Sequence, residues 1–288
     1  MMTQHERREP SPPRGFLYDD LPYVLPMAVF LFFTWLGGYG APDKPPPAAS
    51  GPALLTTQPA TTAATTAAGT MGAATGPASA PAATALVGSE SGWSNLFPLS
   101  YVLKTFLAAG LIALFWRRYT AISWRHWQLG VLVGVIGIVQ WVGMEKLLLH
   151  YWPDYPRPNV GEPFDPYAHF AGNAAMMWAF TIVRWAGAAL VVPVMEELFW
   201  RDYLWRTLLA PNDFRLAAVG ERDWKVFLIV AAAFATVHVQ WMTAFVWGLM
   251  IAWLLVRTRS LGACIVAHGV TNLLLGAYVQ YTREWYFW

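Results

Sequence analysis

The sequence contains almost no cysteine. Cys264 is the single cysteine in 288 residues, which excludes an internal disulfide framework and any metal cluster built on several thiolates. The H-E-x-x-H pattern of zinc peptidases is also missing from the sequence. No local motif therefore requires a metal ion.

Charged residues are scarce as well. They make up 12% of the chain, about half the share in a soluble domain, whereas 56% of the residues are hydrophobic. A formal net charge of +2, with scattered arginines, argues against nucleic-acid binding. Seventeen Trp and twelve Tyr are typical of a protein with aromatic rings at two membrane–water interfaces. The composition predicts an all-α, polytopic integral membrane protein.

The first third of the chain divides into three parts. Residues 1–20 are polar and predict a cytosolic tail, and residues 21–39 are long and apolar enough for a first transmembrane helix. No cleavage signal follows closely, so we expect an uncleaved anchor. Residues 40–94 are rich in Ala, Thr and Pro and predict a disordered loop.

The remainder, residues 95–288, predicts a multi-helix membrane domain. Its hydrophobic segments are 95–116, 129–149, 171–192, 194–209, 224–240, 242–256 and 261–280. With the first helix they give eight candidates. The segment 194–209 is short and charged, and it can instead continue a bent helix that begins at 171 and is kinked at Pro193.

The arginines give two possible topologies. The three arginines within residues 117–125 predict a cytosolic loop, and the loop 150–170 is then expected outside. Eight crossings would place Arg257 and Arg259 outside, whereas a continuous helix through 194–209 would return them to the cytosol. The charge distribution favours seven crossings, and the family resemblance given below favours eight.

The stretch "PVMEELFWRDYLWR" carries four charges at the edge of an apolar segment, where ionisable groups are costly. Glu197 and Arg201 are four residues apart and can form an ion pair on one helix face. Glu196 then has no cation of its own. Arg206, further along, is expected to extend to the lipid headgroups.

Three more polar residues occur in later apolar segments. His268 and Asn272 are four residues apart, so an imidazole and an amide share one helix face. His238 follows Phe234 by one turn, and that ring can form an apolar wall beside the imidazole. Each residue alone has a structural interpretation, such as a hydrogen bond between helices. The set of buried acid, two His, Asn and Arg favours a functional site.

These residue types permit more than one chemistry. A carboxylate with a neutral His can deprotonate water, and a second His with an Asn can donate hydrogen bonds to an oxyanion. Glu196, His238 and His268 would also suit zinc, with water as the fourth ligand. Cys264 shares a face with His268, but no third group activates a thiol nucleophile there.

Three motifs occur in order on successive hydrophobic segments: "EELFWR" has the form E-E-x-x-x-R, "FATVH" the form F-x-x-x-H, and "HGVTN" the form H-x-x-x-N. Together they resemble the CPBP intramembrane proteases, also called the Abi or CAAX-protease family. The resemblance covers about residues 170–280 and includes the CAAX-protease-related subgroup that accompanies bacterial exosortase systems. It implies about eight transmembrane helices around a polar cavity open to the cytosol.

The resemblance also implies a site of four catalytic and two supporting residues: Glu196, His238, His268, Asn272, Glu197 and Arg201. Glu196 and His238 would activate water, and His268 with Asn272 would form the oxyanion hole. This glutamate-type mechanism needs no cofactor. The zinc alternative would use Glu196, His238 and His268 as ligands.

The sequence therefore predicts an intramembrane endopeptidase that cleaves a membrane-associated protein or peptide, located in a bacterial inner membrane. A proton-coupled transporter, with Glu196, His238 and His268 as a relay, is a second hypothesis. It lacks support from internal duplication. A non-catalytic scaffold is a third.

Overall fold

The computed structural model describes residues 15–38, 96–157 and 163–288, and the expected loop 40–94 lies outside these ranges. The described chain is helical and contains no strand. Its α-helices are α1 (Leu21–Gly38), α2 (Leu96–Phe115), α3 (Trp127–Tyr151), α4 (Pro166–His169), α5 (Ala174–Ala186), α6 (Val192–Glu197), α7 (Trp205–Leu209), α8 (Trp224–Thr236), α9 (Trp241–Thr258) and α10 (Leu261–Thr282).

Six helical segments in the described ranges are long and apolar enough to cross a bilayer, and α8 is a shorter apolar helix. The protein is thus an all-α, multi-pass helical bundle, as its composition predicts. The two hydrophobic segments 171–192 and 194–209 are not separate helices. They form one helical run, Ala174–Leu209, so the number of hydrophobic helices is seven rather than eight.

The arginine-containing turns lie at one end of the bundle. The hydroxyl of Ser260, next to Arg259, contacts the carbonyl oxygens of Ser123 and Arg125 at 2.7 and 2.6 Å. At the same end Arg215 forms an ion pair with Asp19. This arrangement agrees with the positive-inside bias and with seven crossing segments.

Short polar side chains fix where several helices begin. Asp165, Asn173, Asp223 and Ser260 precede α4, α5, α8 and α10, and each accepts a hydrogen bond from a backbone N–H of the first turn. These bonds satisfy donors that a helix start leaves free, which matters most near a lipid environment.

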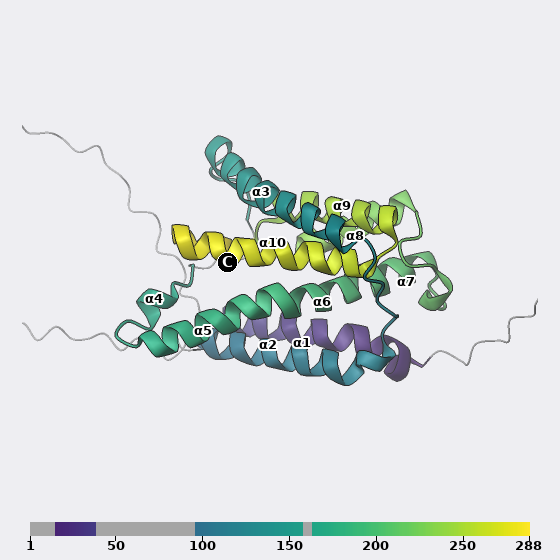
Figure 1. The fold of residues 1–288 in the computed structure, drawn as a ribbon, viewed down its shortest axis with the longest axis horizontal. Coiled ribbons are helices and arrows are strands. Elements are labelled where there is room, and N and C mark those ends of the chain that lie inside the picture. The colour runs from purple at the N-terminus through teal and green to yellow at the C-terminus, as the bar shows by residue number, and fades with distance from the viewer. Residues whose placement is uncertain (1–14, 39–95, 158–162) are drawn as a thin grey trace, which may run out of the picture.

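The centre of the bundle is α10, which lies between α3 and α6 (Figure 1). Small residues on α3 allow this close approach, as is common between membrane helices. A Cβ added at Gly134 would lie 2.6 Å from the backbone oxygen of Ala267 in α10. The approach therefore needs glycine, and it fixes the depth at which the side chains of α10 sit.

A buried acid on α3 is fully engaged. Glu145 is completely buried, accepts hydrogen bonds from Tyr155 and Thr243, and lies 3.9 Å from Arg157. Burial and the adjacent Glu145 carboxylate raise the pKa of the Tyr155 phenol, so the phenol remains a donor. Glu145 thus ties α3 to α9 and to the loop after α3.

Gly134→Ala should destabilise the protein by roughly 1–3 kcal/mol, because the new methyl group would collide with the backbone of α10. Thermal unfolding in detergent measures the effect. Gly143→Ala on the same helix is the control, since nothing lies within 4 Å of its added Cβ. Equal melting temperatures for the two variants would contradict this packing.

Candidate active site

The helical run Ala174–Leu209 has an unusual local structure around its acidic pair. Two π-helical turns, Gly187–Val191 and Leu198–Leu204, flank α6, which ends at Glu197. Such turns often occur at functional sites, because an extra residue changes the direction of the side chains that follow. The sequence predicts a kink at Pro193, but the run continues as a helix through Pro193 in this altered register.

Asn272 compensates for the proline. Pro193 has no N–H, so a carbonyl of the preceding turn loses its donor. The Nδ2 of Asn272 donates to the carbonyl oxygen of Ala188 at 2.8 Å and joins α10 to this turn. One N–H of the amide is used in this way, and the second remains for another acceptor.

Glu197 is the most highly connected residue of the cluster. It is completely buried, its Oε1 lies 2.8 Å from Nδ1 of His268, and its Oε2 lies 3.3 Å from Nε of Arg201. The contact with Arg201 is ionic and lacks the direction of a hydrogen bond. The guanidinium also lies 4.6 Å from the ring centre of Phe234. Glu197 therefore links α6 to α10 and holds a buried cation.

Glu196 has different surroundings. It is also buried, but its Oε2 has no hydrogen-bond partner among the described residues. Its carboxylate interacts electrostatically with His238 and with Lys104. A buried acceptor without a partner is rare and needs an explanation, such as a bound water or a reacting group.

His238 lies in the turn that follows α8. Its Nδ1 lies 2.8 Å from the carbonyl oxygen of Phe234, and its ring packs 4.3 Å from the Phe234 ring and 5.9 Å from that of Trp141. When Nδ1 carries the proton for this bond, Nε2 has a free lone pair. His268 and Arg201 also act electrostatically on this imidazole. The structure therefore gathers these groups from α8, α10 and the 174–209 run.

The candidate zinc ligands do not converge. Within residues 15–38, 96–157 and 163–288, no three His, Cys, Asp or Glu side chains come together as metal ligands. His268 is directed to Glu197 rather than to Glu196, and Nδ1 of His238 is bound to a backbone oxygen. The donor set Glu196, His238 and His268 therefore does not fit zinc in this geometry.

Cys264 is part of the core. It is fully buried, and its sulfur faces the carbonyl oxygen of Ile251 at 3.8 Å. It lies one turn before His268 on α10, but no item of the site surrounds it as a base would.

One expectation was wrong. Arg206 does not extend towards headgroups but is buried, with its Nη1 2.6 Å from Asp202 and its Nε 2.8 Å from the carbonyl oxygen of Ala217. Asp202, one turn earlier, supplies a counter-charge, and the segment around Ala217 folds over the guanidinium. The i, i+4 spacing of Asp202 and Arg206 is the signal in the sequence that indicates this pair.

Two further buried cations also have no counterpart in the motifs. Lys104 in α2 and Arg184 in α5 lie within helices that a hydropathy profile treats as plain membrane spans. A single charge in a long apolar segment is the only sequence signal for them.

The fold and the site define a multi-pass helical membrane protein with buried acids, imidazoles and an arginine gathered where α6, α8 and α10 meet. Residues 177–274 match the family model described as Type II CAAX prenyl endopeptidase Rce1-like. The match confirms the family resemblance over the region that carries the three motifs. It supports a CAAX-type membrane protease as the class of activity. No curated protein and no solved structure matches the chain significantly.

Arg201→Gln should destabilise the protein by about 3–5 kcal/mol, because it leaves Glu197 buried without its cation. The double variant Glu197→Gln with Arg201→Gln removes both charges and should recover part of this loss. A double-mutant cycle on thermal or denaturant unfolding measures the coupling. Additive losses would show that the two charges do not depend on each other.

Proposed function

We propose that the protein is an intramembrane endopeptidase that cleaves a peptide bond of a membrane-associated protein or peptide with a water activated by Glu196 and His238. The observation that carries the proposal is the unpartnered, buried carboxylate oxygen of Glu196 close to the imidazole of His238. A carboxylate in a dry site that accepts no hydrogen bond from the protein is free to accept one from water.

The chemistry follows from these positions. Glu196 takes a proton from the water while the water oxygen attacks the carbonyl carbon of the substrate. The carbonyl oxygen then carries a negative charge, which hydrogen-bond donors must stabilise. The proton held by Glu196 passes to the nitrogen of the leaving amine as the C–N bond breaks. One water is consumed, and an acid and an amine are released.

His268 and Asn272 are the proposed donors to the oxyanion. The second N–H of the Asn272 amide is available once Ala188 has taken the first. For His268, Nδ1 faces Glu197, so donation from Nε2 at the same time requires a proton on both ring nitrogens. Glu197 supports this state by its negative charge, and Arg201 balances Glu197 in turn.

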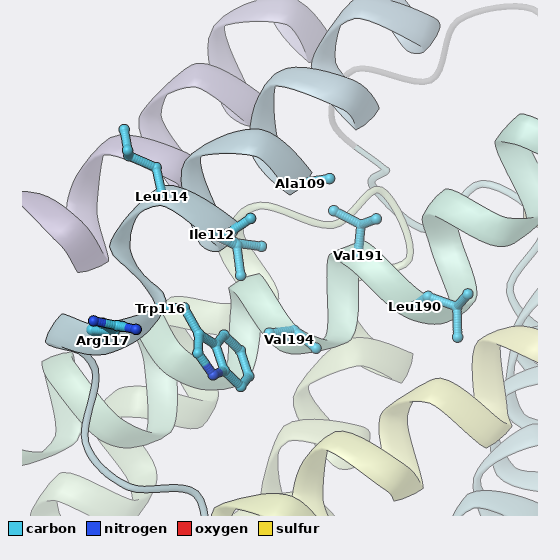
Figure 2. A pocket seen from close by; sticks show the side chains of 9 residues that line it. Ala109, Ile112, Leu114, Trp116, Arg117, Leu190, Val191 and Val194 are labelled. Atoms are coloured by element: carbon cyan, nitrogen blue, oxygen red, sulfur yellow. The ribbon is translucent and has the colours of Figure 1, made fainter.

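An apolar groove beside the site suits a membrane-associated substrate. It has a volume of about 650 Å³ and lies between α2 and the 174–209 run, and it is lined by Ile112, Leu190, Val191 and Val194, with Trp116 and Arg117 at one end (Figure 2). Val194 is two residues from Glu196. A prenyl or acyl chain, or an apolar segment of the substrate, would occupy such a surface.

Glu196→Gln should lower cleavage by roughly 10²–10⁴-fold, because the amide cannot accept the proton of water. The melting temperature should change little, since the oxygen has no partner to lose. The assay uses the purified protein in liposomes, with a prenylated CAAX peptide and a membrane-tethered reporter protein.

Cys264→Ala is the matched control and should keep its activity, because the thiol faces Ile251 in the core. Loss of activity in this variant would favour a thiol nucleophile. Undiminished cleavage by Glu196→Gln would end the proposal. The transporter and scaffold hypotheses both predict that no cleavage depends on Glu196.

Chelation with EDTA or 1,10-phenanthroline should change the rate by less than about twofold, because the mechanism uses a carboxylate base and hydrogen-bond donors alone. Metal analysis of the purified protein accompanies the assay. A loss of activity that stoichiometric zinc restores would instead establish the metal-dependent mechanism.

A further inference from the structure

Lys104 in α2 and Arg184 in α5 are cations buried within membrane-spanning helices, with 6% and 3% of their surface exposed. Neither has a carboxylate within 4 Å in the part of the chain that the structure describes. A positive charge at this depth is costly unless it is balanced, and such residues usually mark a functional site. The two residues therefore need an explanation that the proposed catalytic steps do not give.

The surroundings of Arg184 leave part of its guanidinium open. Its carbon lies over four aromatic rings, at 4.6 to 5.9 Å from their centres: Trp288, Phe97, Tyr101 and Phe164. The ring faces attract the positive charge, but they do not take the place of acceptors in the plane of its N–H groups. Nε and Nη1 are buried and have no hydrogen-bond partner among the described residues.

Lys104 connects this cation to the catalytic region. Its Nζ donates to Thr34 at 3.0 Å and lies 4.3 Å from the centre of the Tyr101 ring, which Arg184 also contacts. The ammonium group interacts electrostatically with Arg184 and with the carboxylate of Glu196. Lys104 is therefore a charged link between the open guanidinium and the proposed base.

We propose that Arg184 and Lys104 bind a carboxylate of the peptide substrate, to one side of the bond that is cut at Glu196. This inference rests on the proposed function. Nε and Nη of arginine form a planar pair of donors that matches the two oxygens of a carboxylate, and the lysine adds a second charge. One bound anion would balance two cations that otherwise face a single unpaired acid.

The spacing sets where the carboxylate lies in the substrate. Arg184 precedes Glu196 by twelve positions on one helical run, which corresponds to roughly 18 Å at the rise of a helix. An extended peptide covers about 3.3–3.6 Å per residue. The carboxylate is therefore about five residues from the cleaved bond. An acidic side chain or the free end of the peptide supplies the same chemistry at this distance.

The experiment measures peptide binding to the Glu196→Gln protein, which should bind substrate without cleaving it, in nanodiscs of neutral phosphatidylcholine. Three fluorescent peptides share one sequence and end five residues beyond the reporter bond: one with a free terminal carboxylate, one with a terminal amide, and one with that amide and a Glu at the fifth position. We expect the two acidic peptides to bind roughly 10-fold or more tightly than the neutral one. The comparison between the acidic peptides distinguishes a chain end from a side chain.

Arg184→Gln and Lys104→Gln should each reduce this preference for acid towards one. Arg184→Lys keeps the charge, loses the planar fork, and should retain part of the preference, which provides a test if Arg184→Gln does not fold. Arg118→Gln is the matched control, because Arg118 also lies over an aromatic ring, at 4.7 Å from that of Tyr18, but is exposed. It should leave the preference unchanged.

Three results would overturn the inference. An unchanged acid preference in both Arg184→Gln and Lys104→Gln would show that the cations do not bind the peptide. Binding of phosphatidylglycerol, but not of acidic peptide, that depends on Arg184 would identify a lipid site. An acid preference that emerges only after Glu162→Gln, at a position outside the described residues, would make Arg184 an internal ion-pair partner.

The failure of this inference differs from a failure of the proposed function. If the acid preference is insensitive to Arg184 and Lys104 while cleavage still requires Glu196, the peptidase stands and the subsite falls. If the preference requires Arg184 but no cleavage requires Glu196, the anion site stands without the peptidase.

Discussion

The arrangement of the site depends on one fully buried carboxylate, that of Glu197. It lies between the imidazole of His268 and the guanidinium of Arg201 and so connects two helices that are far apart in the sequence. A charge in such a place is tolerated only when its partners hold it from several sides. The same contacts orient His268 and keep Arg201 against Phe234, so the geometry of the whole cluster follows from this one acid.

Adjacent carboxylates in one short helix thus have separate roles because their surroundings differ. Glu197 has its oxygens directed to protein partners, whereas Glu196 keeps one oxygen unpartnered in a buried position. Groups of identical chemistry commonly divide structural and reactive work in this way when one is saturated and the other is not. The division agrees with the matched family, although the assignment rests on the contacts of these two residues.

Much of the fold was predictable because hydrophobic length is a local property. The helices that cross the membrane follow from apolar runs, and the pair Glu197–Arg201 follows from a spacing of one turn. The union of 171–192 with 194–209 was left open, since π-helical turns leave no clear signal in composition. Arg206 was misplaced because its acceptors include backbone oxygens of a later loop, which no pattern within the helix reveals.

The site was predictable as a set of residues but not as a geometry. Three motifs in order identify the polar side chains, and they say nothing of which imidazole meets which acid. That Asn272 donates to Ala188, next to the gap left by a proline on another helix, is a contact between distant segments. The buried cations Lys104 and Arg184 lie outside every motif, and only packing brings them into relation with Glu196.

The π-helical turn Gly187–Val191 has a consequence for how the chain tolerates change in length. A regular helix turns by about 100° per residue. Removal of one residue from this turn could restore a regular helix, yet it would swing Glu196 and Glu197 together to another side of the bundle. The irregularity therefore acts as the phase setting of the acidic pair, and an uninterrupted helix of the same composition would aim both carboxylates at the wrong neighbours.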